Sequence, residues 1–112
     1  MRIILASIII CLAPLALADP QDSLFSKVER VEARAVGVHS VYLESQIPDE
    51  GCDFDDRAVI DTRTEPGGLY MAELVKDALT FGRSIKLRVE GCVPINVTGL
   101  TAPRIILIQL RF

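Results

Sequence analysis

The stretch LYMAELVKDALTF, residues 69–81, carries the clearest structural pattern of this 112-residue chain. Its apolar residues recur at the i, i+3, i+4, i+7 and i+8 spacing of one helical face, and its charged residues occupy the other face. Gly82 follows at the position where a residue in the left-handed conformation ends many helices. The spacing predicts a helix over residues 69–81 with a core face made of Met71, Leu74, Val75, Ala78 and Leu79.

Strand-like segments flank this helix on both sides. Alternating or β-branched residues predict three strands before it and two after it, over residues 27–36, 39–45, 57–62, 84–90 and 104–112. In residues 27–36, Glu, Arg and Ala also favour a helix. The valines and the period-2 alternation of apolar and charged residues favour a strand there.

The two strands after the helix distribute their apolar residues differently. In residues 84–90 one face is apolar, with Ile85, Leu87 and Val89. In residues 104–112 one face carries Ile106, Ile108, Leu110 and Phe112, and the opposite face carries Ile105 and Leu107. The Ile105 and Leu107 face predicts either an edge between subunits or a surface covered by the helix. Residues 93–103 are expected to form a loop.

The resulting order is β-β-β-α-β-β, mainly β with one helix. This order fits an OB-fold-like five-stranded Greek-key barrel, in which the helix closes one end. A two-layer α+β sandwich has the same order and is the alternative. We expect one domain over residues 27–112, preceded by a short polar leader over residues 19–26.

The first 18 residues, MRIILASIIICLAPLALA, have the pattern of a secretory signal peptide. Arg2 precedes a short apolar run, and Ala16-Leu17-Ala18 provides the small residues of a cleavage site. A membrane anchor needs about 20 apolar residues, more than this interrupted run contains. A lipoprotein signal needs a small residue before Cys11, where isoleucine stands. We expect an exported bacterial protein, periplasmic or secreted, that leaves the membrane after cleavage.

Two cysteines, Cys52 and Cys92, remain after residue 18. In an exported chain an even number of cysteines predicts a disulfide. This bond would tie the loop before residues 57–62 to the end of residues 84–90, and would contribute about 4 kcal/mol in the chain-entropy model. With His39 as the one histidine, a four-ligand zinc site would need carboxylates. We expect no metal and no cofactor.

The charge and the aromatic content argue against a nucleic-acid partner. The formal net charge is −3, and a nucleic-acid binder has a basic surface. Stacking on bases or sugars would depend on few aromatic residues, because the chain has no tryptophan. These residues are Phe25, Tyr42, Phe54, Tyr70, Phe81 and Phe112.

One acidic stretch has the chemistry of a calcium site. It contains Asp49, Glu50, Asp53, Asp55 and Asp56. Counted from Asp53, however, positions 5 and 12 of an EF-hand loop are Arg57 and Thr64, and position 12 needs a carboxylate. A solvated loop beside the disulfide is the simpler interpretation.

No catalytic pattern surrounds the remaining polar residues. Ser40 and Ser45 lie near His39 in the sequence, but neither serine is in a nucleophile-elbow pattern. Asp61 and Glu65 form a carboxylate pair of the kind that 15 acidic residues produce by chance. Two further motifs complete the set. Gly67-Gly68 lacks the spacing of a phosphate-binding loop and provides the turn before the helix. Asn96-Val97-Thr98 is a glycosylation pattern that is incidental in a bacterial protein.

The tract YMAELVKDALTFGRSIKLRVEGC, residues 70–92, resembles the helix-then-strand segment of the B subunits of subtilase-type cytotoxins, including the turn at Phe81-Gly82. PRIILIQL, residues 103–110, is similar to the last strand of small exported bacterial proteins related to those subunits. The resemblance covers about the last half of the chain that follows residue 18. It implies an OB fold, no enzyme activity, and glycan binding by a ring of five subunits. None of the sugar-binding serine, tyrosine or aspartate positions of those subunits can be matched to a residue here.

Two functions of different classes follow. The first is a non-enzymatic exported binding module that presents a face to a glycan, a protein or its own copies. The alternative is a periplasmic or secreted accessory or inhibitor protein that acts through a disulfide-pinned loop around Cys52 or Cys92. A minimal hydrolase that uses Asp61, Glu65 or His39 is a third interpretation.

Overall fold

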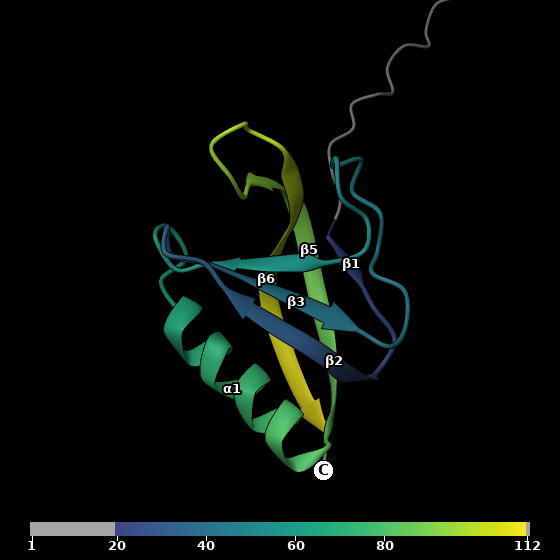
Figure 1. Cartoon of the computed structure of the whole chain (residues 1–112). Coiled ribbons are helices and arrows are strands. Elements are labelled where there is room, and N and C mark those ends of the chain that lie inside the picture. Colours follow the sequence, from purple (N-terminus) through teal and green to yellow (C-terminus); the bar gives the residue numbers. More distant parts are fainter. Residues whose placement is uncertain (1–19, 112) are drawn as a thin grey trace, which may run out of the picture.

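The computed structural model describes residues 20–111, so that the expected signal peptide and Phe112 lie outside the described residues (Figure 1). The chain is mainly β with one helix, as predicted. The elements are β1 (Gln21–Asp22), β2 (Ser26–Ala33), β3 (Val38–Leu43), β4 (Ala58–Asp61), α1 (Gly68–Phe81), β5 (Ser84–Pro94) and β6 (Thr101–Arg111).

One short strand lies where the sequence predicted only a leader. β1 pairs with β5 through Gln21 opposite Val89 and Asp22 opposite Arg88. Between β1 and β2, the Ser23 amide donates to the Leu87 carbonyl at 2.8 Å. Residues 21–26 therefore belong to the fold, and β1 extends along β5 the pairing that the start of β2 makes with the same strand.

The six strands form one mixed sheet. Five of them, β2 to β6, pair in a closed ring, and β1 adds to β5. β2 pairs with β3, and β3 with β4, in antiparallel fashion. β4 pairs with β6 in parallel through Val59 and Arg104, and β6 with β5 in antiparallel fashion. β5 pairs with the start of β2 at Ser26 and Lys27, which closes the ring.

Helix α1 forms where the apolar spacing predicts it and ends at Gly82. This glycine has a φ of 66°, and its amide donates to the carbonyl of Ala78. Met71, Val75 and Ala78 are buried on the core side. Leu79, predicted to belong to the same face, is 44% exposed, so that part of the prediction is wrong. In the described part of the chain no helix has the length and hydrophobicity needed to cross a bilayer.

The main core lies inside the ring of strands, with α1 packed against β2, β4, β5 and β6. Ile85, Leu87 and Val89 are fully buried in it, as the alternation in residues 84–90 predicts. From the other strands Val41, Ile60 and Ile105 join them.

A β-bulge in the β5–β6 pair reverses the predicted faces of β6. Val89 is opposite Ile105, whereas Leu87 is opposite Ile108, so β6 has one residue more than β5 over this interval. Because an extra residue shifts the phase of the alternation, Ile105 points into the core before the bulge and Ile108 and Leu110 pack on it after the bulge. The predicted face that joined Ile105 to exposed Leu107 is therefore wrong, and Ile105 forms no subunit edge.

A second small core lies on the outer side of β3 and β4. The expected loop over residues 93–103 is shorter than predicted and covers residues 95–100, because β5 runs to Pro94 and β6 begins at Thr101. This end of the β5–β6 hairpin curls over β4 (Figure 1) and packs on the second core. That core consists of Val38, Val59, Val93, Ile95 and Ala102, with Phe54 against it. Consequently both faces of β3 and β4 are covered at this end.

The predicted disulfide between Cys52 and Cys92 is present, with 5.7 Å between the Cα atoms. It joins the segment between β3 and β4 to the distal half of β5, as the sequence predicts. We call residues 44–57 and 91–103 together the disulfide end.

Candidate functional site

A hollow of about 740 Å³ lies beside α1. Val31 and Ala33 of β2 and His39 of β3 form one side, and α1 with the turn before it forms the other. We call this hollow the α1 groove. Its remaining lining residues are Pro66, Leu69, Tyr70, Ala72, Glu73, Lys76 and Leu79.

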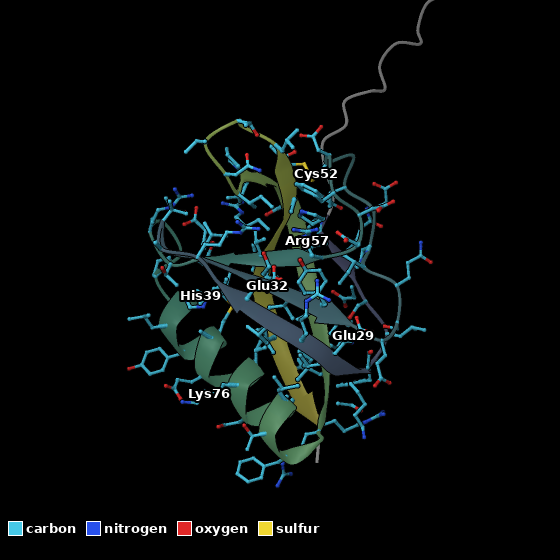
Figure 2. All side chains as sticks on the ribbon, in the orientation of Figure 1. Glu29, Glu32, His39, Cys52, Arg57 and Lys76 are labelled. Carbon is cyan, nitrogen blue, oxygen red and sulfur yellow. A yellow bond between two sulfur atoms is a disulfide. The ribbon has the colours of Figure 1, made fainter. Side chains whose placement is uncertain are left out.

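The groove exists because the inner face of the β2–β3 pair extends beyond the part that α1 covers. Ala33 is opposite His39, and Val31 is opposite Val41, which lies in the main core. Cross-strand partners share one face of a sheet, so the floor of the groove continues the core surface outward. Figure 2 shows His39 at this end of the sheet, near the start of α1.

The helical wall of the groove is a second stripe of α1, adjacent to the core stripe, that combines apolar and charged residues. Its members follow helical spacing, and they are Leu69, Ala72, Glu73, Lys76 and Leu79. Leu69 is 71% exposed and its neighbour Tyr70 is 80% exposed. Large apolar side chains that gather beside a hollow mark a contact surface more often than single exposed ones do.

Two opposite charges lie in this wall. Within residues 20–111 neither Glu73 nor Lys76 makes an ion pair or a side-chain hydrogen bond. Both side chains are exposed. The groove therefore offers one acidic and one basic group that the protein itself does not use.

The outer face of β3 has a different character, because its aromatic ring is enclosed. Tyr42 is buried between two guanidinium groups, with the Arg30 carbon 3.9 Å and the Arg57 carbon 5.0 Å from the ring centroid. Arg57 also lies 4.2 Å from the centroid of Phe54. These four side chains form a continuous stack across the sheet. Figure 2 shows Arg57 over this face.

The polar group of Tyr42 is used as well. Its hydroxyl donates to Glu32 at 2.9 Å. Burial, together with this hydrogen bond, raises the pKa of Tyr42, and the same bond lowers the pKa of Glu32. Tyr42 and Phe54 are thus engaged in packing and are not free to stack on a sugar or a base.

The carboxylates of the acidic stretch bind mostly to the protein itself. Glu50 accepts from the Gly91 amide at 2.9 Å, and Asp53 accepts from the Thr101 amide at 2.9 Å. Asp49 accepts from the Gly51 amide, and Asp56 pairs with Arg57 at 2.9 Å. Across residues 20–111 no group of three or more His, Cys, Asp or Glu residues is placed to hold a metal ion. These acids hold the loop in place through contacts within the chain, which the interpretation as a solvated loop did not predict.

The residues considered for catalysis do not come together. Adjacent residues of a strand point to opposite faces, so His39 lines the groove while Ser40 is fully buried on the other side of β3. Ser45 lies beyond the end of β3, and its hydroxyl, like that of Ser40, has no hydrogen-bond partner among the described residues. His39 and Ser40 therefore point to opposite faces of β3 and form no nucleophile–base pair.

Asp61 and Glu65 form no acid–base pair. The carboxylate of Asp61 accepts from the amide and guanidinium of Arg63 and from the hydroxyl of Thr64. Hydrogen bonds from Arg63, with smaller help from Thr64, lower the pKa of Asp61. A carboxyl held in its ionised form in this way is a turn-stabilising group.

The Asn96-Val97-Thr98 motif forms the tip of the β5–β6 hairpin. The Asn96 side-chain oxygen accepts from the Thr98 amide at 3.1 Å and from the Thr98 hydroxyl at 2.6 Å. The asparagine thus closes its own turn.

The sequence reasoning missed the α1 groove. Leu69 and Tyr70 precede the predicted core stripe and Leu79 ends it, so the apolar residues cover more of the helix than one core face needs. This excess of apolar residues on the helix is the feature of the sequence from which the groove could have been predicted. Searches of protein-family models, curated proteins and solved structures find no match to this chain.

Proposed function

We propose that the protein is an exported, non-enzymatic binding module with an OB-type barrel, and that it contacts another protein through the α1 groove. One observation carries the proposal: the groove combines exposed apolar side chains of α1 with an unused acidic and basic pair. The centres of protein–protein interfaces have this apolar character, with a few polar groups that set orientation.

The pairing pattern supports the OB-type barrel. Leaving the short β1 aside, five strands form a closed ring, and α1 stands between the third and fourth of them. The first pairs with the second and the fourth, and the third with the fifth in parallel. Closure of the ring favours a barrel over a two-layer sandwich, which has free edges.

A protein partner fits the groove better than a glycan does. Carbohydrate recognition needs flat aromatic rings and clustered polar groups. Tyr42 and Phe54 are already stacked on arginines, and the groove itself offers one exposed ring, Tyr70, beside mostly apolar side chains. Glycan binding, which the toxin B-subunit resemblance implies, rests on that resemblance alone and remains a prediction. A glycan array probed with the exported chain is its direct test.

Export is supported by the pattern of residues 1–18 and by the disulfide, because such bonds persist in oxidising compartments. The absence of enzyme activity is supported by the placement of His39 and Ser40 on opposite faces of β3 and by the internal use of Asp61. Neither argument depends on the α1 groove.

Site-specific photocrosslinking tests the proposed contact surface. A photoreactive phenylalanine analogue replaces Tyr70 in the exported chain, and a matched chain carries it at Val97, which is fully exposed on the hairpin tip. We expect an adduct of defined mass from position 70 only, and we expect Leu79→Asp in the same chain to abolish it. An adduct that forms equally at both positions, or no adduct at position 70, would contradict the proposal.

The loop-based alternative also has support from one observation. The loop over residues 44–57 is held by the disulfide and by the hydrogen bonds of Glu50 and Asp53, so that its backbone is rigid. A pre-organised loop is what an inhibitor presents to an enzyme. In that case the photoreactive group at exposed Asp55, rather than at Tyr70, would give the single adduct.

A further inference from the structure

We propose that the occupant of the α1 groove is a second copy of this chain, packed with its α1 antiparallel to the first in a twofold dimer. This inference rests on the proposed function, since it names the partner of the same surface. It differs from the five-subunit ring that the toxin resemblance implies.

The positions of the charges carry the argument. In two antiparallel helices related by a twofold axis between residues 74 and 75, Glu73 of each copy lies opposite Lys76 of the other. Neither side chain has a partner in its own chain within residues 20–111. The twofold axis thus produces two equivalent Glu73–Lys76 pairs between the copies, and the centre of the contact is neutral.

The apolar residues obey the same symmetry. About this axis, Leu69 of one copy lies opposite Thr80 of the other. Tyr70 lies at the height of the other copy's Leu79 but on the other flank of the contact, because nine residues are two and a half turns of an α-helix. The large exposed side chains at the start of α1 are therefore brought to the Leu79 end of the partner's groove. A twofold contact requires that one patch contain both the projecting groups and the hollow that receives them. The α1 groove contains both.

The size of the surface sets the expected strength. A helix of 14 residues is about 21 Å long. Such a contact lies at the small end of specific interfaces, so we expect a reversible monomer–dimer equilibrium rather than an obligate dimer. The apolar side chains provide the affinity, and the charge pairs determine the antiparallel register.

The test exchanges the two charges in separate copies of the exported chain. Glu73→Lys makes the centre of the patch wholly basic, and Lys76→Glu makes it wholly acidic. Each variant alone should self-associate about tenfold more weakly than the unmodified chain, since two attractive pairs become repulsive. When the two variants are mixed, unlike charges meet at all positions, and native mass spectrometry should show the heterodimer in excess of both homodimers.

Controls separate this effect from loss of folding. Val97→Asp on the hairpin tip should leave the self-association constant unchanged, and Leu79→Asp should reduce it more than tenfold. Circular dichroism checks that every variant is folded. A dimer that persists in Glu73→Lys, or a mixture that forms no heterodimer, would overturn the inference.

The failure of this inference can be distinguished from the failure of the proposed function. If the unmodified chain is a monomer at all concentrations by sedimentation, while position 70 still forms its adduct with a different protein, the second copy is excluded and the binding module stands. If position 70 forms no adduct of any kind, both are wrong. A pentamer that is unaffected by Leu79→Asp excludes the twofold dimer.

Discussion

The disulfide end and the α1 groove are made of similar residue types, yet the two regions use them in opposite ways. At the disulfide end the charged groups have partners within the chain. Glu50 and Asp53 accept from the backbone amides of Gly91 and Thr101, and Arg57 stacks on Phe54. In the α1 groove, Tyr70 is 80% exposed, and Glu73 and Lys76 have no partner within the described chain. Polar groups that are satisfied internally stabilise the fold, and groups left unsatisfied at an apolar surface are available to a partner.

This difference predicts that substitutions at the disulfide end affect stability, whereas substitutions in the α1 groove affect association. The largest effect is expected from the double substitution Cys52→Ser and Cys92→Ser. Removing the link between the two segments should lower the free energy of unfolding by about 4 kcal/mol, since the unfolded chain regains the entropy of a long loop. Urea unfolding followed by circular dichroism measures this change. A loss below about 1 kcal/mol would show that hydrogen bonds alone hold the disulfide end.

Arg57→Ala should have the next largest effect. This side chain lies between Tyr42 and Phe54 and pairs with Asp56, and it is largely shielded from solvent. Its removal should lower the free energy of unfolding by about 2 kcal/mol, the size of a desolvated cation–π contact. The matched control is Arg34→Ala, an exposed arginine in the β2–β3 turn, with an expected change below about 0.5 kcal/mol. Equal effects of the two substitutions would argue against the stack as a stabilising unit.

Acid should destabilise the turn at Asp61, which connects β4 to α1. The pKa of Asp61 is lower in the folded protein than in the unfolded chain because Arg63 and Thr64 bind the ionised carboxylate. Such a group contributes stability that is complete above the unfolded pKa of about 3.9 and is lost as the pH falls through the folded pKa. Asp61→Asn should therefore cost about 1.5 kcal/mol at neutral pH and progressively less in acid. Thermal unfolding across the acid range checks the convergence of the two curves, and parallel curves would contradict it.

The smallest effect on stability is expected in the α1 groove. Leu79→Asp replaces a side chain that is 44% exposed and has no part in the main core. The free energy of unfolding of the isolated chain should change by less than about 1 kcal/mol, while self-association is lost. A substantially larger loss of stability would mean that Leu79 packs in the core, as the sequence pattern predicts, and not in the groove. Thermal unfolding at low protein concentration and sedimentation at high concentration separate the two effects.

The sequence predicts the elements well where the pattern is local. Helix α1, its end at Gly82, the buried face of Ile85 and Leu87, and the disulfide all follow from spacing or residue type. For β6 the same reasoning is wrong, since the alternation is interrupted by a bulge that involves the partner strand. The expected loop over residues 93–103 is too long for a related reason. Its two ends are strand because β5 and β6 bend onto the second core, and this contact depends on β3 and β4.

The candidate site was partly visible in the sequence. The residues considered first, His39, Asp61 and the acidic stretch, are chemically conspicuous, yet the structure uses most of them internally. The α1 groove arises because α1 leaves part of the inner β2–β3 face uncovered. The orientation of a helix on a sheet depends on contacts between residues far apart in the chain, which periodicity does not encode.

The sequence by itself thus determined the order of the helix and of five of the six strands, the disulfide and the end of the helix, because each depends on neighbours in the chain or on residue chemistry. The tertiary structure alone decided which apolar residues of α1 remain exposed, where β6 changes face, and that the outer side of β3 is covered. These features result from the competition of distant segments for the same buried surface. That competition is settled only when the whole sheet has closed.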